Sequence, residues 1–501
     1  MESRLGFVVS EGQIRNDIFV PKYYDPEIEA TIESYSETHY LVPVSELMAS
    51  GELEMRQGNY IPKMHYGTGS VPYIRTSDIA NWELRGSPKH GISDNVAQVF
   101  RQKQNVRSDD VLLVHEGTYL IGTGCLITQF DTDILYQHHL ARLRVINDTR
   151  INGPLLMCAL ISSVVQSQIR SKQFTADVID SIVGRFPEVR IPIPKSQQRR
   201  AELTTRARSL FRDRAEARLR LAVFRRGLDA ALESGDLNGL RKEVEEAPET
   251  ANNHGIVGFL GSSYKAESFT ITDGQVRNNI LLPRYYDPAA EDALSNLSGE
   301  CELVSMGDLV ESGVVELSTG DEVGKLAYGT GKIPFVRTSD LGNWELKQDP
   351  KQRVSLEVYE KFARKQSARS EDILLVRDGT YLVGSSAMVT GYDLPLLFSG
   401  GLYRIRVTRP EALDPYLLLA LLNTQVAGRQ MRNKQFTRDV IDTLGRRFEE
   451  VRLPIPRSVE VRAGIASLMR DLVEKRADLR YAVGQLGNEL LGKKIPRQRS
   501  S

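Results

Sequence analysis

The stretch YGTGSVPYIRTSDIANWEL, residues 66–84, recurs further along the chain as YGTGKIPFVRTSDLGNWEL, residues 328–346. The two copies lie 262 positions apart, and the same separation relates several other matched pairs: Gln13 and Gln275, Gly117 and Gly379, Arg142 and Arg404, Gln173 and Gln435, and Pro192 and Pro454. A constant separation leaves no net insertion between these anchors. Because solenoid repeats run to only ~20–50 residues, the pattern predicts a duplicated domain with one fold in both halves.

Length and composition set the broad class of the protein. A chain of 501 residues with 41% hydrophobic content has apolar material for about three or four folded units. Its longest apolar run, residues 154–165, is shorter than the ~20 residues of a membrane span, so we expect a buried helix there and no membrane segment. The N-terminal residues show no secretory signal, and three scattered cysteines, Cys125, Cys158 and Cys301, suit a reducing cytoplasm.

The charge balance is even, with 65 basic and 65 acidic residues. The chain as a whole is therefore no polycation. Any contact with nucleic acid has to use local basic surfaces.

Each half reads as a mixture of strands and helices. Short β-rich runs at 71–75, 110–114 and 140–146 predict strands, while the apolar runs at 154–171 and 415–432 predict helices. Each half then closes with a proline-bounded strand, IPIP or LPIP, ahead of a long segment without proline.

These two long segments carry matching heptad patterns. The first has seam residues Leu203, Leu210, Ala217, Phe224 and Ala231, with Ala207, Leu221 and Leu228 in the second register; the other has Ile465, Leu472, Leu479 and Leu486, with Met469, Val483 and Leu490. Arg214 and Arg476 interrupt the two seams at equivalent places. The match favours two long helices that pack lengthwise on each other, and the alternative is two amphipathic helices that each dock on their own domain.

Boundaries follow from these patterns. We expect one domain over residues 1–195, a spacer helix over 196–233 and a linker rich in glycine, acids and asparagine over 234–262. A second domain then covers 263–457, and a second spacer helix covers 458–492.

The order of the motifs resembles a known family. Each half has a G-x-G turn followed by (V/I)P(Y/F)(I/V)R-x-SD, then LLV-x-(E/D)-GT, QFT-x-DVID and (I/L)PIP ahead of its helix. Over almost the whole chain this arrangement resembles the specificity subunits of type I restriction-modification systems. The resemblance implies an α+β fold with two homologous mixed α/β target recognition domains, separated by a pair of long antiparallel coiled-coil helices.

The resemblance also implies a function. Such a chain reads a bipartite, asymmetric site in double-stranded DNA and positions partner DNA adenine methyltransferase subunits, two of them in view of the duplication, with or without a restriction or translocase subunit. The chain itself is expected to be non-catalytic and cytoplasmic and to hold no cofactor, with S-adenosylmethionine on the methyltransferase. Two alternatives remain open: a recognition component of another modification or phage-defence complex, and a protein-interaction scaffold that does not bind DNA.

Polar residues that both copies share in loops are candidates for contacts with the DNA backbone, the part of DNA that does not vary with sequence. They are Lys63, Arg75, Thr76, Ser77, Thr118, Tyr119, Lys172 and Gln173 in the first copy, and Lys325, Arg337, Thr338, Ser339, Thr380, Tyr381, Lys434 and Gln435 in the second. For Asp78, Asp340 and the glycines of these turns, a purely structural role is favoured.

Positions at which the copies differ in polar character are candidates for base reading, because two half-sites of different sequence need different side chains. They are Arg56, Asn59, Tyr60, His65, His90 and His115 in the first copy, and Ser318, Asp321, Glu322, Gln352 and Arg377 in the second. Each of them, taken singly, also fits ordinary surface variation.

Other motifs lack the residues that their chemistry requires. Gly331-Lys332 is followed by Ile333, where a phosphate loop needs Ser or Thr. The pair His138-His139 is replaced by glycines in the second copy, and neighbours on a strand point to opposite faces, which argues against a shared metal site. The chain shows no adenine-methyltransferase box, no glycine-rich cofactor motif and no repeated nucleophile arrangement, so the sequence predicts no catalysis.

Overall fold

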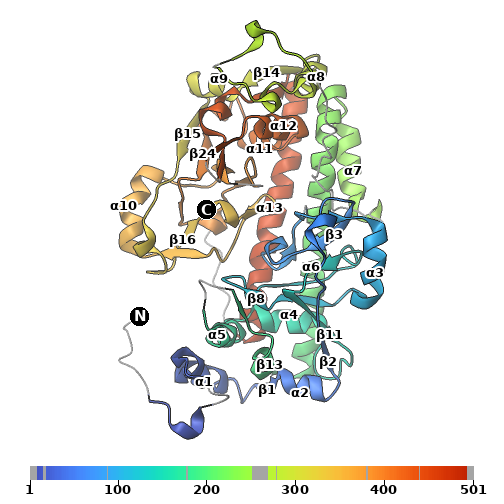
Figure 1. Cartoon of the computed structure of the whole chain (residues 1–501), viewed down its shortest axis with the longest axis vertical. Helices are drawn as coiled ribbons and strands as arrows, with labels where there is room; N and C mark the ends of the chain where they lie inside the picture. The colour runs from blue at the N-terminus through green and yellow to red at the C-terminus, as the bar shows by residue number, and fades with distance from the viewer. Residues whose placement is uncertain are drawn as a thin grey trace. The chain divides into compact units, whose positions relative to one another are not determined.

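The computed structural model describes residues 8–14, 18–86, 88–175, 179–250, 269–277, 279–379, 382–438 and 441–493 (Figure 1). The chain divides into two compact units. The first consists of the described residues of Met1–Leu84, Pro88–Arg212 and Ala482–Arg497, and the second of those in Arg85–Ser87 and Asp213–Tyr481. Each unit therefore contains nearly all of one copy of the repeat together with part of each long helix.

The first unit is built from short strands and five α-helices of its own in the described residues. The helices are α1 Pro26–Glu33, α2 Val44–Ala49, α3 Asp94–Gln104, α4 Gly153–Ile161 and α5 Ser163–Lys172. The strands are β1 His39–Pro43, β2 Leu53–Gln57, β3 Val71–Ile74, β4 Ile79–Ala80, β5 Glu83–Leu84, β6 Gly91–Ile92, β7 Val111–Val114, β8 Glu116–Gly117, β9 Gly124–Leu126, β10 Leu135–Tyr136, β11 Leu140–Val145, β12 Asp180–Ser181 and β13 Arg190–Pro194.

A four-stranded antiparallel sheet, in the order β2-β11-β7-β9, forms the centre of this unit. All four residues of β7 are buried, and they alternate between two cores because successive side chains of a strand point to opposite faces. Val111 and Leu113 pack in the core that contains α4, whereas Leu112 and Val114 pack with Ile74 and other residues on the opposite face.

The second unit repeats this architecture. Its helices are α7 Leu237–Thr250, α8 Pro288–Leu297, α9 Met306–Glu311, α10 Leu356–Gln366, α11 Pro415–Leu422 and α12 Gln425–Asn433. Its strands are β14 Cys301–Ser305, β15 Val315–Thr319, β16 Ile333–Val336, β17 Leu341–Gly342, β18 Glu345–Leu346, β19 Gln352–Val354, β20 Ile373–Val376, β21 Asp378–Gly379, β22 Ser386–Met388, β23 Leu397–Phe398, β24 Leu402–Val407, β25 Phe436–Arg438, β26 Ile441–Thr443 and β27 Arg452–Pro456.

Equivalent elements keep the separation of 262 residues, and the main sheets keep their order. The sheet β15-β24-β20-β22 matches β2-β11-β7-β9, and the pair β14-β27 matches β1-β13. One small sheet differs: β8 pairs with β12 alone among the described residues, whereas β21 belongs to a three-stranded sheet with β26 and β25. The prediction of two homologous mixed domains is confirmed by this correspondence.

The helix predicted over 154–171 is two helices. Ser162 has an extended backbone (φ −64°, ψ 143°), and its hydroxyl accepts a hydrogen bond from the backbone N–H of Val165, which caps α5. In the second copy the run 415–432 breaks in the same way, because Thr424 caps α12 by accepting from Ala427. A serine or threonine N-cap overrides an otherwise continuous apolar run.

The two long helices are α6 Gln197–Ser234 and α13 Val459–Leu490, drawn green and red in Figure 1. In the first unit, the start of α6 packs on the end of α13: Leu203 and Ala207 share a core with Leu486 and Leu490. The pairing is antiparallel, since Arg206 near the start of α6 forms an ion pair with Glu489 near the end of α13, at 2.7 Å.

In the second unit, the end of α6 packs on the start of α13, so that Leu228 and Ala231 share a core with Ile465 and Met469. Both helices also pack on the domain of the unit in which they lie, since the same core contains residues of α11. The lengthwise pairing predicted from the heptads is confirmed, and docking on the domains occurs as well.

The seam break brings two arginines together. Arg214 and Arg476 each place Nη2 at 3.0 Å from Oε2 of Glu345, on β18, and Nη1 of Arg214 donates to the carbonyl of Arg476. Both arginine side chains are at most 2% exposed, and Glu345 is 7% exposed. The interruption of the heptads is thus a buried charged cluster.

The segment predicted as a linker is partly helical. Helix α7 lies within it, and Leu240 and Val244 are buried in the core of the second unit. The prediction was wrong for this part, because Leu240 and Val244 recur at helical spacing and give the segment an apolar face in spite of its glycines and acids. The remainder of the predicted linker, from residue 251, lies outside the described residues.

Among the described residues, no helix is both long and apolar enough to cross a membrane.

Candidate nucleic-acid interface

The Arg-Thr-Ser-Asp motif forms a tight turn after a buried strand. In the first copy β3 ends at Ile74, and residues 76–78 make one turn of 3-10 helix. Asp78 is 2% exposed, and its Oδ2 accepts a hydrogen bond from the backbone N–H of Arg75 at 2.9 Å. Asp340 makes the same bond to Arg337. The structural role expected for these two aspartates is confirmed, while Thr76, Ser77, Thr338 and Ser339 are half-buried beside them.

The arginine of this turn has different surroundings in the two copies. Nη1 of Arg75 lies 3.2 Å from Nε2 of His90, and Nε donates to Oε1 of Gln137 at 3.3 Å. Arg337 is exposed and lies over the ring of Tyr328, with 5.9 Å to the ring centroid. The first copy therefore holds its arginine in a polar network that the second copy lacks at the matching positions, Gln352 and Ser399.

His90 is fixed by stacking. Its ring lies 4.3 Å from that of Tyr66, with an interplanar angle of 30°. Burial, and then the positive charges of Arg75 and Lys89, lowers the pKa of His90 to about 4. The imidazole is therefore neutral at pH 7, and because Nε2 faces the Arg75 donor, we assign the proton to Nδ1.

The turn before the glycine-rich loop carries exposed side chains in both copies. Lys63 and Lys325 are exposed, and His65 is half-buried. Between them, Met64 is 79% exposed, and its counterpart Leu326 is 97% exposed.

Tyr60 lies near this turn and is 61% exposed, with its ring edge-on to His138 at 5.7 Å between centroids. Glu322, its counterpart, is exposed as well. These two positions have the accessibility that base reading requires.

Other base-reading candidates already make hydrogen bonds or ion pairs within the domain. Oδ1 of Asn59 accepts from Gln104 at 3.0 Å, and Asp321 accepts from Gln366 at 3.1 Å, so this matched pair has the same structural task in both copies. Arg56, on β2, is 57% exposed but pairs with Glu54 at 2.5 Å. Its counterpart Ser318 is half-buried on β15, as is Gln352 on β19.

His115 and Arg377 differ sharply in exposure. His115 is 1% exposed, its Nε2 lies 2.9 Å from the carbonyl oxygen of His138, and burial lowers its pKa. This placement does not support base reading by His115. Arg377 is partly exposed, pairs with Asp378 at 2.5 Å and lies over the ring of Tyr403.

The lysines proposed to grip phosphate near the end of each domain are engaged in the fold. Lys172 is 9% exposed, its Nζ lies 3.1 Å from Oε2 of Glu188, and it sits over the ring of Tyr23, whose hydroxyl bonds the same carboxylate. This Lys-Glu-Tyr cluster ties the leading segment of the domain to its body. It leaves Lys172 poorly placed for a phosphate.

The second copy repeats the cluster with Lys434, Glu450 and Tyr285. The neighbouring glutamines, Gln173 and Gln435, are also buried, and the amide of Gln173 donates to the backbone carbonyl of Thr118. Residue sharing between the copies was the reason for predicting phosphate contacts, but here the shared residues hold the fold. Thr118 and Tyr119 are half-buried, while Thr380 and Tyr381 lie outside the described residues.

The histidine pair has a geometry that strand alternation does not predict. His138 and His139 lie between β10 and β11, in a turn, and their ring centroids are 3.9 Å apart. The expectation that they point to opposite faces was wrong because neither belongs to a strand. Nδ1 of His139 lies 2.8 Å from Oε1 of Glu116. In the described part of the chain, no group of three or more His, Cys, Asp or Glu residues could hold a metal ion.

The sequence interpretation missed Met64 and Leu326. Their signal was present, because a large apolar residue occupies the same place in both copies, next to a lysine and just ahead of the glycine-rich turn. A single exposed apolar side chain is ordinary on a protein surface, so it is the recurrence at the same place in both domains that makes this position a candidate for contact.

Comparisons with known proteins give structural matches only. No protein-family model matches the chain, and no curated protein sequence matches it. Among solved structures, the S subunit of a type I restriction-modification system from M. genitalium aligns over 92% of this chain and 96% of its own, with 12% identity and a TM-score of 0.34.

Two further structures align at similar coverage. One, described in terms of complex assembly and conformational transition of the type I R-M system, covers 91% of this chain and 97% of its own, with 16% identity and a TM-score of 0.27. The HsdS subunit of Thermoanaerobacter tengcongensis covers 88% and 94%, with 15% identity and a TM-score of 0.23. At TM-scores this low, the case for a function rests on the residues and geometry of this chain.

Proposed function

We propose that the chain is a non-catalytic DNA specificity subunit, which reads the two halves of a bipartite, asymmetric site with its two domains. The observation that supports this proposal most is that both domains have the same fold but carry different polar side chains around the same turn. Two domains of the same fold suit two half-sites on DNA, and different side chains allow each half-site to have its own sequence.

The polar groups of the first domain suit base recognition. A neutral His90 with its proton on Nδ1 donates one hydrogen bond, which matches an acceptor such as N7 or O6 of guanine. Its stacking on Tyr66 and its contact with Arg75 fix the direction of that bond. In the second domain Gln352 stands at the same position, and an amide offers both a donor and an acceptor, which suits adenine.

The exposed turns suit contact with the DNA backbone. Lys63 and Lys325 carry charge at equivalent places, and an exposed lysine forms an ion pair with phosphate without a fixed geometry. The paired helices α6 and α13 join the two domains and set the length of the unread gap between half-sites. In this proposal two partner adenine methyltransferase subunits bind S-adenosylmethionine and carry out the methyl transfer, with or without a restriction or translocase subunit. The chain works in the cytoplasm.

The test is selection from random duplexes with the purified chain, followed by sequencing of what is retained. We expect a split motif with two short specified parts and an unspecified gap of constant length. The same chain alone should transfer no methyl group from S-adenosylmethionine and cut no DNA. Retention without sequence preference, or activity of the isolated chain, would contradict the proposal.

A further inference from the structure

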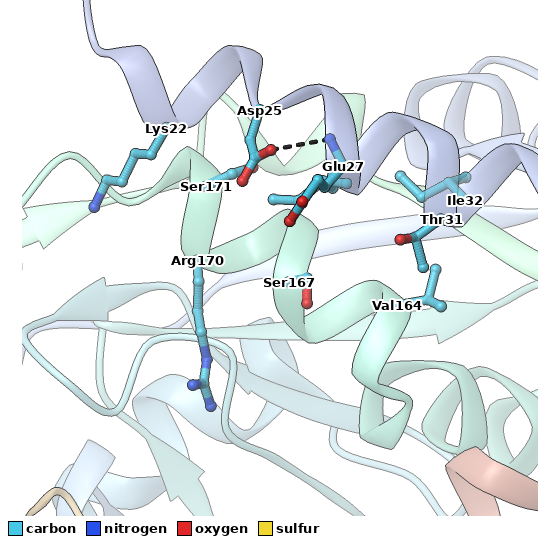
Figure 2. A pocket seen from close by; sticks show the side chains of 10 residues that line it. Lys22, Asp25, Glu27, Thr31, Ile32, Val164, Ser167, Arg170 and Ser171 are labelled. Atoms are coloured by element: carbon cyan, nitrogen blue, oxygen red, sulfur yellow. Dashed lines mark hydrogen bonds between the residues drawn. The ribbon is translucent and has the colours of Figure 1, made fainter. Parts of the chain in front are cut away.

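A groove of about 380 Å³ opens between α1 and α5 of the first unit (Figure 2). Asp25 and Glu27 line it from the α1 side, and Ser167 and Ser171 line it from α5. Oδ1 of Asp25 accepts the backbone N–H of Glu27 at 2.9 Å and so caps α1. The carboxylate thus has one structural bond, and its side chain still borders the groove.

In the second domain, an arginine side chain occupies the place equivalent to this groove. There Asp287 is the counterpart of Asp25 and receives a guanidinium: Nε of Arg429 lies 2.5 Å from Oδ2, and Nη2 lies 2.9 Å from Oδ1. Nδ2 of Asn433 adds a third bond at 2.9 Å. Burial acts to raise the pKa of Asp287, but these bonds lower it overall. Asp287 also caps its own helix, so capping and guanidinium binding are compatible.

The first domain lacks the internal arginine but has the carboxylate. Ser167 and Ser171 replace Arg429 and Asn433, and the groove is the space that these shorter side chains leave.

Two residues that line the groove are more polar than their counterparts in the second domain. Glu27 stands where the second domain has Ala289, and Thr31 stands where it has Ala293. Part of the lining is apolar, since Ile28, Ile32 and Val164 also line the groove. An apolar strip beside the carboxylate of Asp25 matches the arginine side chain, which has a hydrocarbon stem and a planar charged head.

We propose that this groove binds an arginine side chain of a partner protein, with the guanidinium on Asp25 as Arg429 sits on Asp287. The two cations at the rim leave that place open: in Figure 2 Lys22 and Arg170 both extend away from Asp25. An arginine on a partner reproduces the internal arrangement of the second domain, where a neighbouring helix delivers the side chain. The site is separate from the DNA-reading turns, and its occupation does not depend on the function proposed above.

The experiment uses the full chain and ligand-observed NMR with acetyl-L-arginine amide as the probe. Acetyl-L-citrulline amide is the control, since it has the same shape without the charge. We expect millimolar binding of the arginine probe, and binding of the citrulline probe weaker by about tenfold or more, because a bidentate ion pair is lost.

Three variants locate the site. Asp25→Asn keeps the helix cap and should abolish the preference for arginine over citrulline. Ser167→Arg combined with Ser171→Asn copies the second domain and should block the probe. Asp287→Asn is the matched control and should leave probe binding unchanged.

The opposite results would overturn the proposal. They are equal binding of both probes, unchanged binding to the filled double variant with an intact circular dichroism spectrum, or no binding at all to the wild-type chain. Free L-arginine as a tighter ligand than the amide would indicate a site for an amino acid and would also refute docking of a partner side chain.

Discussion

The buried cluster of Arg214, Glu345 and Arg476 allows a sharp test of how the long helices are held together. Glu345→Gln removes the charge and changes the shape little. The two arginines then face each other beside a neutral amide, in a place where all three side chains are almost fully buried. The heptad seams that Arg214 and Arg476 interrupt are otherwise apolar.

The magnitude follows from the geometry. Each guanidinium nitrogen lies 3.0 Å from the same carboxylate oxygen, which at an effective dielectric constant of about 20 gives roughly 5–6 kcal/mol of attraction per pair. Desolvation and the repulsion between the arginines offset much of this attraction. Removing one partner of a buried ion pair nevertheless costs about 3–5 kcal/mol. We therefore expect Glu345→Gln to lower the free energy of unfolding of the second unit by about that amount.

The assay is urea unfolding followed by circular dichroism and by tryptophan fluorescence, since Trp344 lies next to Glu345 in the second unit. A triple variant, Arg214→Leu with Glu345→Leu and Arg476→Leu, is the matched control. It continues the apolar seam, and well-packed apolar replacement of a buried charged cluster is often neutral or stabilising. A single variant as stable as the wild type, or a triple variant less stable than Glu345→Gln, would refute the reasoning.

Three further predictions concern DNA and pH. His90→Gln should change preference in one half-site only, by ~1–3 kcal/mol. The pKa of His90 is lowered to about 4, so the wild type loses stability as the pH falls from about 6.5 to 4. The variant should lose less stability over that range, as measured by thermal unfolding. Lys63→Ala or Lys325→Ala should weaken binding to all duplexes alike and reduce the salt slope by roughly one unit each, and a change of sequence preference would contradict the backbone role. Adding one heptad after Arg214 and after Arg476 should lengthen the unread gap by about three base pairs, since seven residues extend a helix by roughly 10 Å; an unchanged gap in an active complex, read from its methylated sites, would refute the spacer role.

The fold was predictable where the sequence repeats itself. A constant separation of 262 residues predicted two equivalent domains, and β7 and β20 occupy matching places in matching sheets. The heptads predicted two paired helices and located their interruption. They could not predict that Arg214 and Arg476 meet at Glu345, because this contact depends on a strand far away in the sequence.

The candidate site was harder to predict because a residue that both copies share can either contact DNA or stabilise the fold. Lys63 and Lys172 are both lysines that both copies share, so sequence alone gives them the same role. The structure separates them, since Lys63 is exposed on a turn and Lys172 is buried against Glu188 and Tyr23. Asn59 and Asp321 are the opposite case. The residue differs between the copies, but in each copy it accepts a hydrogen bond from the equivalent glutamine.

Exposure therefore distinguishes shared residues that can meet DNA from shared residues that stabilise the fold. Positions that are shared and exposed are candidates for the invariant DNA backbone, and the turn of Lys63 and Met64 meets both conditions together with its counterpart, Lys325 and Leu326. An apolar side chain at the tip of a charged turn can contact a thymine methyl group or enter between bases, while the lysine next to it holds the phosphate. Because the apolar position is occupied by Met in one domain and by Leu in the other, the same turn can grip both half-sites and still touch them differently.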